Sequence, residues 1–244
     1  MLDPAEREAL LRGLGAQESA LSESEKHALD RDGYVVFEKL FDAGQVARMR
    51  AALDDLIGKA RLDPTWHAGG TLHLADLIND SAFDPVWQSS RLLSAIVHVL
   101  GYDLRIGTVA YRAPKPGYGA QTLHADVMEA GAGEYQAATA IVALVDFTKT
   151  NGPTRVIPGS HRAPRPVPSD ADTPHPEQLL VTCPAGSTIV FNGHLQHSGT
   201  RNASQETRHA LQITFARRQS SIYGTARVDN ATLERVGDAA FLFL

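Results

Sequence analysis

The first third of the chain carries apolar residues at the spacing of a helix. Val46, Met49, Leu53 and Leu56 recur every three to four positions after Asp42. Residues at this spacing share one face of a helix, so the pattern predicts an amphipathic helix that begins after Asp42. Its apolar face is expected to pack against the core of the protein.

Three further helices are predicted from signals at their ends. An N-cap residue followed by proline, a capping box, and a glycine after the last apolar position each mark a helix terminus. These signals are Asp3-Pro4 with Gly13, Ser22 and Glu25 with Gly33, and Gly101 after the apolar run SSRLLSAIVHVLG. The first hundred residues are therefore expected to be mainly helical.

Short apolar runs, broken by turn residues, predict strands instead. They cover 34–41, 103–112, 137–147, 154–157, 178–183, 187–192 and 210–217. Strands of this length and spacing are typical of an antiparallel sandwich or barrel. The prediction is a mainly β fold with flanking α-helices, formed by a single domain. Within it, a helical part covers about residues 1–101, the β core about 103–218, and a C-terminal tail 219–244.

Composition and charge are those of an ordinary globular protein. Of the 244 residues, 43% are apolar and 21% are charged, which argues against a disordered chain. The formal charge of −5 argues against nucleic acid as a partner, because phosphate binding requires a basic surface. Cys183 is the only cysteine, so no disulfide within the chain is expected.

No targeting or membrane segment is expected either. The first residues, MLDPAEREALLRGLG, lack the basic and apolar regions of a signal peptide. No apolar run approaches the roughly 20 residues that a membrane helix requires. These features predict a cytoplasmic protein.

His124 and Asp126 are the first candidates for a functional site. Residues two apart on an extended chain point to the same face, so the imidazole and the carboxylate would converge on one point. Two such ligands hold a divalent metal weakly, and a third has to come from elsewhere in the chain. The histidines available for this role are His161, His175, His194, His197 and His209.

His197 and Arg208 are expected to lie close together. The residues between His197 and the predicted strand 210–217 favour loops, so the chain should fold back and return Arg208 beside His197. A guanidinium is a rigid fork of donors suited to a carboxylate. Two histidines and one carboxylate on one face of a metal leave open positions, which is the pattern of non-haem Fe(II) oxygenases.

Four stretches of the chain resemble the phytanoyl-CoA dioxygenase family of iron(II)- and 2-oxoglutarate-dependent oxygenases. They are DGYVVFEKLF, YRAPKPGYGAQTLHAD, LVDFTKTNGPTRVIPGSHR and GHLQHSGTRNASQETRHAL. They follow one another in the family's order from about Asp32 to Arg218. The resemblance implies a double-stranded β-helix, also called a jelly roll, as the core of the fold.

The resemblance also implies which residues form the site. His124, Asp126 and His197 would bind Fe(II), and Arg208 would pair with the distal carboxylate of 2-oxoglutarate. Gln121 stands where many relatives place a polar contact to this cosubstrate. O₂ would be the second cosubstrate.

Asn202 matches the family's asparagine five residues past the distal histidine, and it is expected to orient the loop around it.

Two alternative sets of metal ligands remain at this point. His194 is close enough in sequence to replace His197 as a ligand. His175 and Glu177 form another pair of a histidine and a carboxylate, but a proline-rich loop surrounds them.

The reaction implied by the resemblance is the oxidation of a small molecule, coupled to the conversion of 2-oxoglutarate into succinate and CO₂. Hydroxylation of a C–H bond in a secondary metabolite or an amino-acid derivative is the expected outcome. A halogenase is disfavoured, because related halogenases replace the carboxylate ligand by a small residue whereas this chain has Asp126. A jelly-roll isomerase or lyase, or a metabolite-binding module without 2-oxoglutarate, is disfavoured by Arg208.

Two irregular segments, 127–137 and 161–178, flank the predicted site. The first leaves directly from Asp126, and the second is rich in proline and longer than most connections in compact domains. Such loops often bind or cover a ligand. Both are predicted to close over the substrate.

Overall fold

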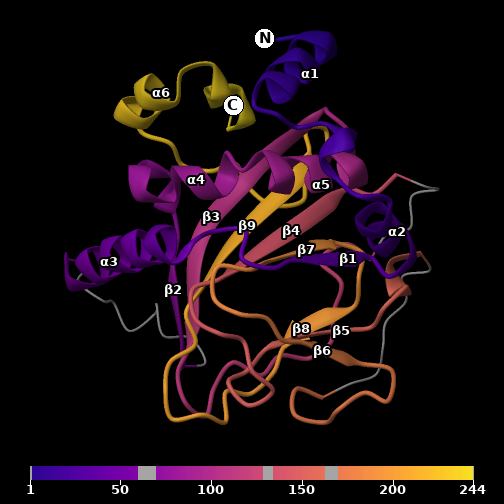
Figure 1. Cartoon of the computed structure of the whole chain (residues 1–244), viewed down its shortest axis with the longest axis vertical. Helices are drawn as coiled ribbons and strands as arrows, with labels where there is room; N and C mark the ends of the chain where they lie inside the picture. Colours follow the sequence, from indigo (N-terminus) through magenta and orange to yellow (C-terminus); the bar gives the residue numbers. More distant parts are fainter. Residues whose placement is uncertain (1, 60–69, 129–133, 163–169, 244) are drawn as a thin grey trace.

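The computed structural model of the chain describes residues 2–59, 70–128, 134–162 and 170–243. Two antiparallel sheets form its centre, and they lie one above the other in Figure 1. In spatial order, the large sheet consists of β1 (Tyr34–Phe37), β7 (Thr188–Asn192), β4 (Ala137–Ala143), β9 (Ala210–Arg217), β3 (Leu104–Pro114) and β2 (Thr71–Leu74). The small sheet consists of β6 (Leu179–Val181), β5 (Thr154–Val156) and β8 (His197–Gly199). The predicted jelly roll with flanking helices is confirmed.

The helices lie mainly in the first hundred residues and at the C-terminal end. The α-helices are α1 (Pro4–Gly13), α2 (Glu23–Arg31), α3 (Ala43–Lys59), α4 (Asp84–Trp87), α5 (Ser90–Leu100) and α6 (Asn230–Val236). Short 3₁₀ helices are η1 (Glu18–Ala20), η3 (Leu77–Asn79), η4 (Ser81–Phe83), η5 (Ser160–Arg162) and η6 (Gly237–Leu242). Among the described residues, no helix has the length and apolar character needed to cross a membrane.

Most of the predicted helix ends are confirmed by their hydrogen bonds, but Gly13 is the last residue inside α1 and not the residue after it, because Leu14 is the C-cap. Ser22 and Glu25 form the expected capping box of α2, with each side chain bonded to the backbone N–H of the other. Asp3 caps α1 in the same way, with Glu6 as its partner. Gly101 ends α5 at a φ of 76°, a value that glycine adopts without steric strain.

Several strands are shorter than predicted. The run 34–41 is a strand only as far as Phe37, because Lys39 adopts a left-handed conformation with a φ of 50° that ends the pairing. The run 137–147 ends as β4 at Ala143, and beyond it only an isolated bridge joins Phe147 to Cys183. Strand β2 and the short helices α4 and α6 were not predicted.

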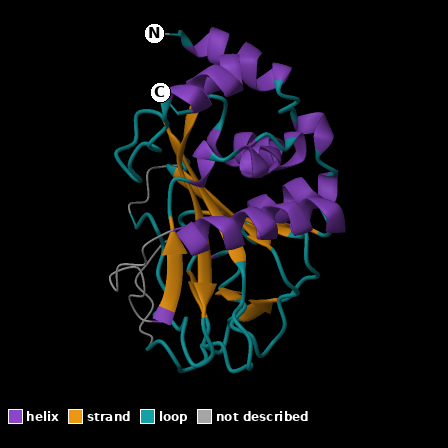
Figure 2. Ribbon diagram, turned by 90° about the vertical axis from the view of Figure 1, so that its left-hand side faces the viewer, coloured by secondary structure: helices purple, strands orange, loops and turns teal. Residues whose placement is uncertain are grey.

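The helices cover one face of the large sheet, as Figure 2 shows. Helix α5 contributes most to this layer, since its apolar residues Leu92, Leu93, Ile96 and Leu100 are fully buried. Burying an apolar side chain of this size contributes about 1.5–3 kcal/mol to stability. The opposite face of the large sheet faces the small sheet, and the candidate site lies in the space between the two sheets.

Arg155 on β5 ties the small sheet to the loop beside it. Its side chain is almost fully buried, and its guanidinium donates to Ser198 Oγ at 2.6 Å and to the carbonyl of Gln121 at 2.9 Å. It also donates to three carbonyls of the turn 170–173. One guanidinium therefore joins three separate segments around the site.

Replacing Arg155 by methionine is expected to lower the free energy of unfolding by about 3 kcal/mol, because several buried acceptors would lose a charged donor. Urea denaturation followed by circular dichroism measures this loss. Arg201→Ala is the control, since Arg201 pairs with Asp172 at the surface and the loss of an exposed ion pair should change stability far less. Equal losses in the two variants would contradict the structural role of Arg155.

The two segments predicted to close over a substrate are described only in part. Residues 129–133 of the first and 163–169 of the second lie outside the described residues. The remainder of the second segment includes the turn 170–173, which Arg155 holds. Closure of these segments over a substrate stays a prediction.

Candidate functional site

His124, Asp126 and His197 meet between the two sheets. The potential ligand atoms of the three side chains all lie within 4.8 Å of one another. The Nε2 atoms of His124 and His197 are each 3.9 Å from Asp126 Oδ1. The backbones of the two histidines pair with one another, His124 N–H to His197 O at 3.0 Å and His197 N–H to His124 O at 2.8 Å. This backbone pairing holds the two histidines side by side, although they are 73 positions apart in the chain.

Each histidine has one ring nitrogen occupied by a backbone carbonyl. His124 Nδ1 lies 2.9 Å from the carbonyl of Thr122, and His197 Nδ1 lies 2.9 Å from that of Leu195. A carbonyl only accepts, so both Nδ1 atoms carry a proton, and in this tautomer a neutral ring keeps the free lone pair on Nε2. Burial lowers the pKa of His197, which favours the neutral ring that a metal requires.

The carboxylate of Asp126 is also held on one side. Its Oδ2 accepts a hydrogen bond from the hydroxyl of Tyr223 at 2.5 Å and a longer one from Thr139 Oγ1 at 3.5 Å. Burial raises the pKa of Tyr223, so the phenol remains a donor. Asp126 Oδ1 faces the two imidazoles. The three side chains thus fit a metal ion: two imidazole nitrogens and one carboxylate oxygen converge, and a second hydrogen-bond partner orients each ligand.

The other candidate histidines lie apart from this group. His194 Nε2 accepts from the backbone N–H of Gln136 at 3.1 Å, and its ring packs against Tyr135. His161 packs against the same tyrosine ring. His209 Nδ1 bonds the hydroxyl of Tyr111 on β3. None of these three belongs to the potential metal group found among the described residues.

His175 is also separate from the group. Its Nδ1 accepts from the backbone N–H of Glu177 at 3.2 Å, a local contact of the surface loop. His175 therefore bonds within its own turn, and neither His175 nor Glu177 belongs to the potential metal group found among the described residues.

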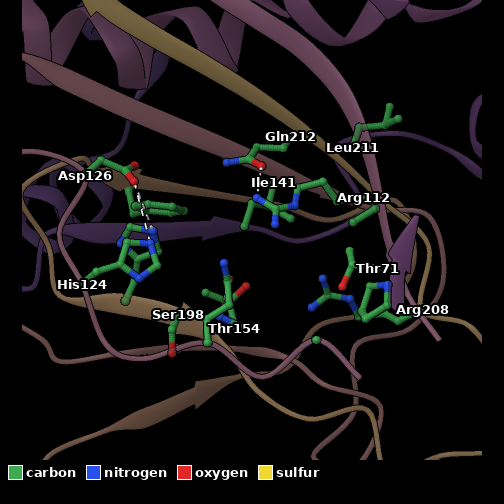
Figure 3. Close-up of a pocket in the computed structure, with 17 residues that line it drawn as sticks. Thr71, Arg112, His124, Asp126, Ile141, Thr154, Ser198, Arg208, Leu211 and Gln212 are labelled. Carbon is green, nitrogen blue, oxygen red and sulfur yellow. Dashed lines mark hydrogen bonds and ion pairs between the residues drawn. The ribbon is translucent and has the colours of Figure 1, made fainter. Parts of the chain in front are cut away.

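A cavity of about 150 Å³ extends from the group toward Arg208. In the view of Figure 3, His124 and Asp126 lie at one end and Arg208 lies toward the other. The Arg208 guanidinium stacks on the Phe147 ring at 4.6 Å and donates to the carbonyl of Gly152. Burial, and secondarily the charge of Arg112, lower its pKa to about 10, so Arg208 still carries its charge at neutral pH.

Arg112 is a second guanidinium in the cavity, and the sequence alone did not identify it. It comes from β3 and donates to Gln212 Oε1 at 3.2 Å. Burial lowers its pKa, and the charge of Asp126 acts in the opposite direction. Among the described residues that line the cavity, Asp126 is the only acid. The cavity is therefore cationic, and its chemistry suits an anion.

Gln121 and Asn202 occupy different positions relative to the cavity. Gln121 lines it, and its Oε1 accepts from the backbone N–H of Gly199 at 3.2 Å. Asn202 is fully buried outside it, where its Nδ2 donates to the carbonyls of Pro114 and Glu206. These hydrogen bonds join the end of β3 to the loop that leads to Arg208, and the role of Asn202 in orienting this loop stays a prediction.

The chain matches the family model described as phytanoyl-CoA dioxygenase (PhyH) over residues 29–210. Among curated proteins it is similar to dioxygenase trt7 of Aspergillus terreus, at 33% identity over 118 residues. The match covers 45% of this chain and 40% of trt7, so it spans less than half the length of that relative.

Two solved structures share the fold. HygX of Streptomyces hygroscopicus, with nickel and 2-oxoglutarate bound, has a TM-score of 0.72 and 18% identity, and the match covers 87% of this chain and 93% of HygX. The epimerase SnoN, in complex with Fe³⁺, α-ketoglutarate and nogalamycin RO, has a TM-score of 0.62 and 24% identity, with 80% and 82% covered. Because the family model matches most of its length, the chain belongs to the phytanoyl-CoA dioxygenase family.

Proposed function

We propose that the protein is an Fe(II)- and 2-oxoglutarate-dependent oxygenase that hydroxylates a C–H bond of a small-molecule metabolite. The observation that carries the proposal is the combination of two features in one cavity. One end has the convergent ligand atoms of His124, Asp126 and His197, and the other has the buried guanidinium of Arg208. A dianion that also chelates a metal fits both ends.

The side chains divide the work of binding. His124, Asp126 and His197 would hold the iron on one face, so that its other positions stay open. Arg208 would bind the distal carboxylate of 2-oxoglutarate with a charge-assisted hydrogen bond. Arg112 adds a second positive charge along the cavity. When bound, the iron supplies the activation of O₂ that is coupled to the conversion of 2-oxoglutarate into succinate and CO₂.

Phe147 and Gly152 prepare Arg208 for this role. The aromatic ring and the carbonyl hold the guanidinium in one orientation before the cosubstrate binds. Among the described residues its Nε has no hydrogen-bond partner, although it is buried. A buried donor without a partner is unfavourable, so an incoming carboxylate that accepts from it gains affinity. The arrangement favours an anionic ligand at this end.

A second candidate reaction is supported by the relatives. SnoN is an epimerase of the same fold with iron and α-ketoglutarate, so this fold accommodates outcomes other than hydroxylation. Product analysis separates the two. Hydroxylation adds one oxygen atom from O₂, which mass spectrometry detects with ¹⁸O₂, whereas epimerisation leaves the mass unchanged.

Anaerobic titration of the Fe(II)-loaded protein with 2-oxoglutarate is expected to produce a visible charge-transfer band. The band arises only when a 2-oxo acid chelates the iron through two atoms, and succinate, which lacks the oxo group, should not produce it. A protein that binds iron stoichiometrically but gives no band would contradict the proposal. That result would favour a jelly-roll metal protein that does not use 2-oxoglutarate.

A further inference from the structure

Residues 220–224 follow β9 and return to the face of the large sheet that holds the site. We call this segment the tail segment. Figure 1 shows the chain turning back after β9 before it reaches α6. The proposed function assigns it no role, yet one of its side chains reaches Asp126. The contacts that hold the segment indicate what it does.

Arg105 on β3 binds the backbone of the tail segment. Its guanidinium donates to the carbonyls of Ser220 and Ile222 at 3.0 Å, and to those of Tyr223 and Gly224 at 2.8 Å. The side chain is only 8% exposed. A buried guanidinium with four carbonyl acceptors on one short segment fixes the path of that segment closely.

Gly107 on β3 makes room for the same segment. A Cβ atom at this position would lie 2.8 Å from Tyr223 Cβ and 2.8 Å from Thr214 Oγ1, closer than atoms pack. The register of β3 against β9 also shifts between Ile106 and Thr108, which marks a bulge. Bulges and glycines in strands often mark the close approach of another backbone.

Tyr223 itself adopts an uncommon conformation. Its φ is +57°, a left-handed value that residues other than glycine rarely adopt. Such conformations persist where the surroundings determine them, and they are enriched at functional sites. Here the result is that the phenol hydroxyl lies 2.5 Å from Asp126 Oδ2 and 3.3 Å from Thr139 Oγ1.

We propose that Tyr223 is a positioning residue for the metal site, and that Arg105 and Gly107 hold it there. The inference rests on the proposed function. By occupying Asp126 Oδ2, the phenol leaves Oδ1 as the single oxygen aimed between the two imidazoles. A carboxylate that binds through one oxygen takes one coordination position. The remaining positions of a bound metal would then stay open for the cosubstrates, whereas a carboxylate bound through both oxygens would occupy one of them.

The test compares Tyr223→Phe with Tyr111→Phe in the full chain. Both tyrosines are mostly buried and each has a short hydroxyl contact, but Tyr111 bonds His209, away from Asp126. The probe is Co(II), whose visible absorption reports both affinity and coordination number. Tyr223→Phe is expected to weaken Co(II) binding about 10-fold and to alter the spectrum, because the free Oδ2 can then also coordinate. Tyr111→Phe should do neither.

Arg105→Met provides a second variant that keeps the phenol. It should raise hydrogen exchange in residues 220–224 and weaken Co(II) binding in the same direction as Tyr223→Phe. Unchanged affinity and spectrum in Tyr223→Phe would overturn the inference, as would equal losses in Tyr111→Phe. Neither result bears on the proposed function, which the charge-transfer titration of the wild-type protein with 2-oxoglutarate tests separately. If the wild-type protein does not bind Co(II), the proposed function fails and the inference fails with it.

Discussion

Alanine at His124, Asp126 or His197 is expected to reduce turnover by about 1000-fold or more, the equivalent of at least about 4 kcal/mol of transition-state stabilisation. The reason is geometric. The three ligand atoms lie within 4.8 Å of one another, and two ligands alone hold a divalent metal weakly. Succinate formation and metal content, measured on the same preparations, would show loss of activity together with loss of iron.

His194→Ala is the control for this set. His194 is only three residues from His197 and is also buried, but it bonds the backbone of Gln136 instead of facing Asp126. The variant is expected to lose some stability and to retain stoichiometric iron. An inactive, iron-free His194→Ala together with an active His197→Ala would show that the ligand assignment is wrong.

The parts of the fold that sequence predicted well are those determined by neighbouring residues. The capping box of Ser22 and Glu25 spans four positions, and its hydrogen bonds form within them. The apolar repeat of α3 likewise specifies a helix before any tertiary contact forms. Strand ends were predicted less accurately, because β1 stops where Lys39 turns, and that turn places Phe41 N–H against the carbonyl of Gly186. Such a contact is not visible in the local pattern.

The same distinction applies to the site. His124 and Asp126 were found because two-residue spacing puts them on one face of an extended chain, and the family resemblance supplied His197 and Arg208. Tyr223 carries no local signal of this kind. It lies 97 positions from Asp126, and long-range contacts such as the binding of its backbone by Arg105 place it there.

Arg112 was missed for a different reason. In a strand, every second residue lies on the same face, so an alternation of apolar and polar residues shows which face is buried. Strand β3 is buried along most of its length and lacks a purely polar face, so its sequence does not show which residues line the cavity. Which face lines the cavity is decided by the position of the small sheet. The sequence therefore predicts the strand but not the direction of this side chain.

Arg208→Ala is expected to raise the concentration of 2-oxoglutarate required for half-maximal activity by about 100-fold, with iron still bound. The loss of a charge-assisted hydrogen bond in a buried site costs a few kcal/mol of binding free energy, by order of magnitude. Arg208 is 8% exposed, so water compensates little for its loss. Arg208→Lys should recover only part of the affinity, because an ammonium lacks the planar fork and cannot stack on Phe147 in the same way. Titration of the charge-transfer band with 2-oxoglutarate measures the binding directly.

Arg201→Ala separates the specific effect from a general loss of positive charge. Arg201 lies seven residues earlier on the same loop, and its guanidinium pairs with Asp172 at the surface. Its removal changes the net charge by the same amount as Arg208→Ala, so any long-range attraction of the dianion would weaken equally in both variants. The 2-oxoglutarate affinity of Arg201→Ala should change by less than about 3-fold, since exposed ion pairs contribute little. Matching losses in the two variants, or unchanged affinity in Arg208→Ala, would mean that the cosubstrate carboxylate binds elsewhere, with Arg112 as the next residue to replace.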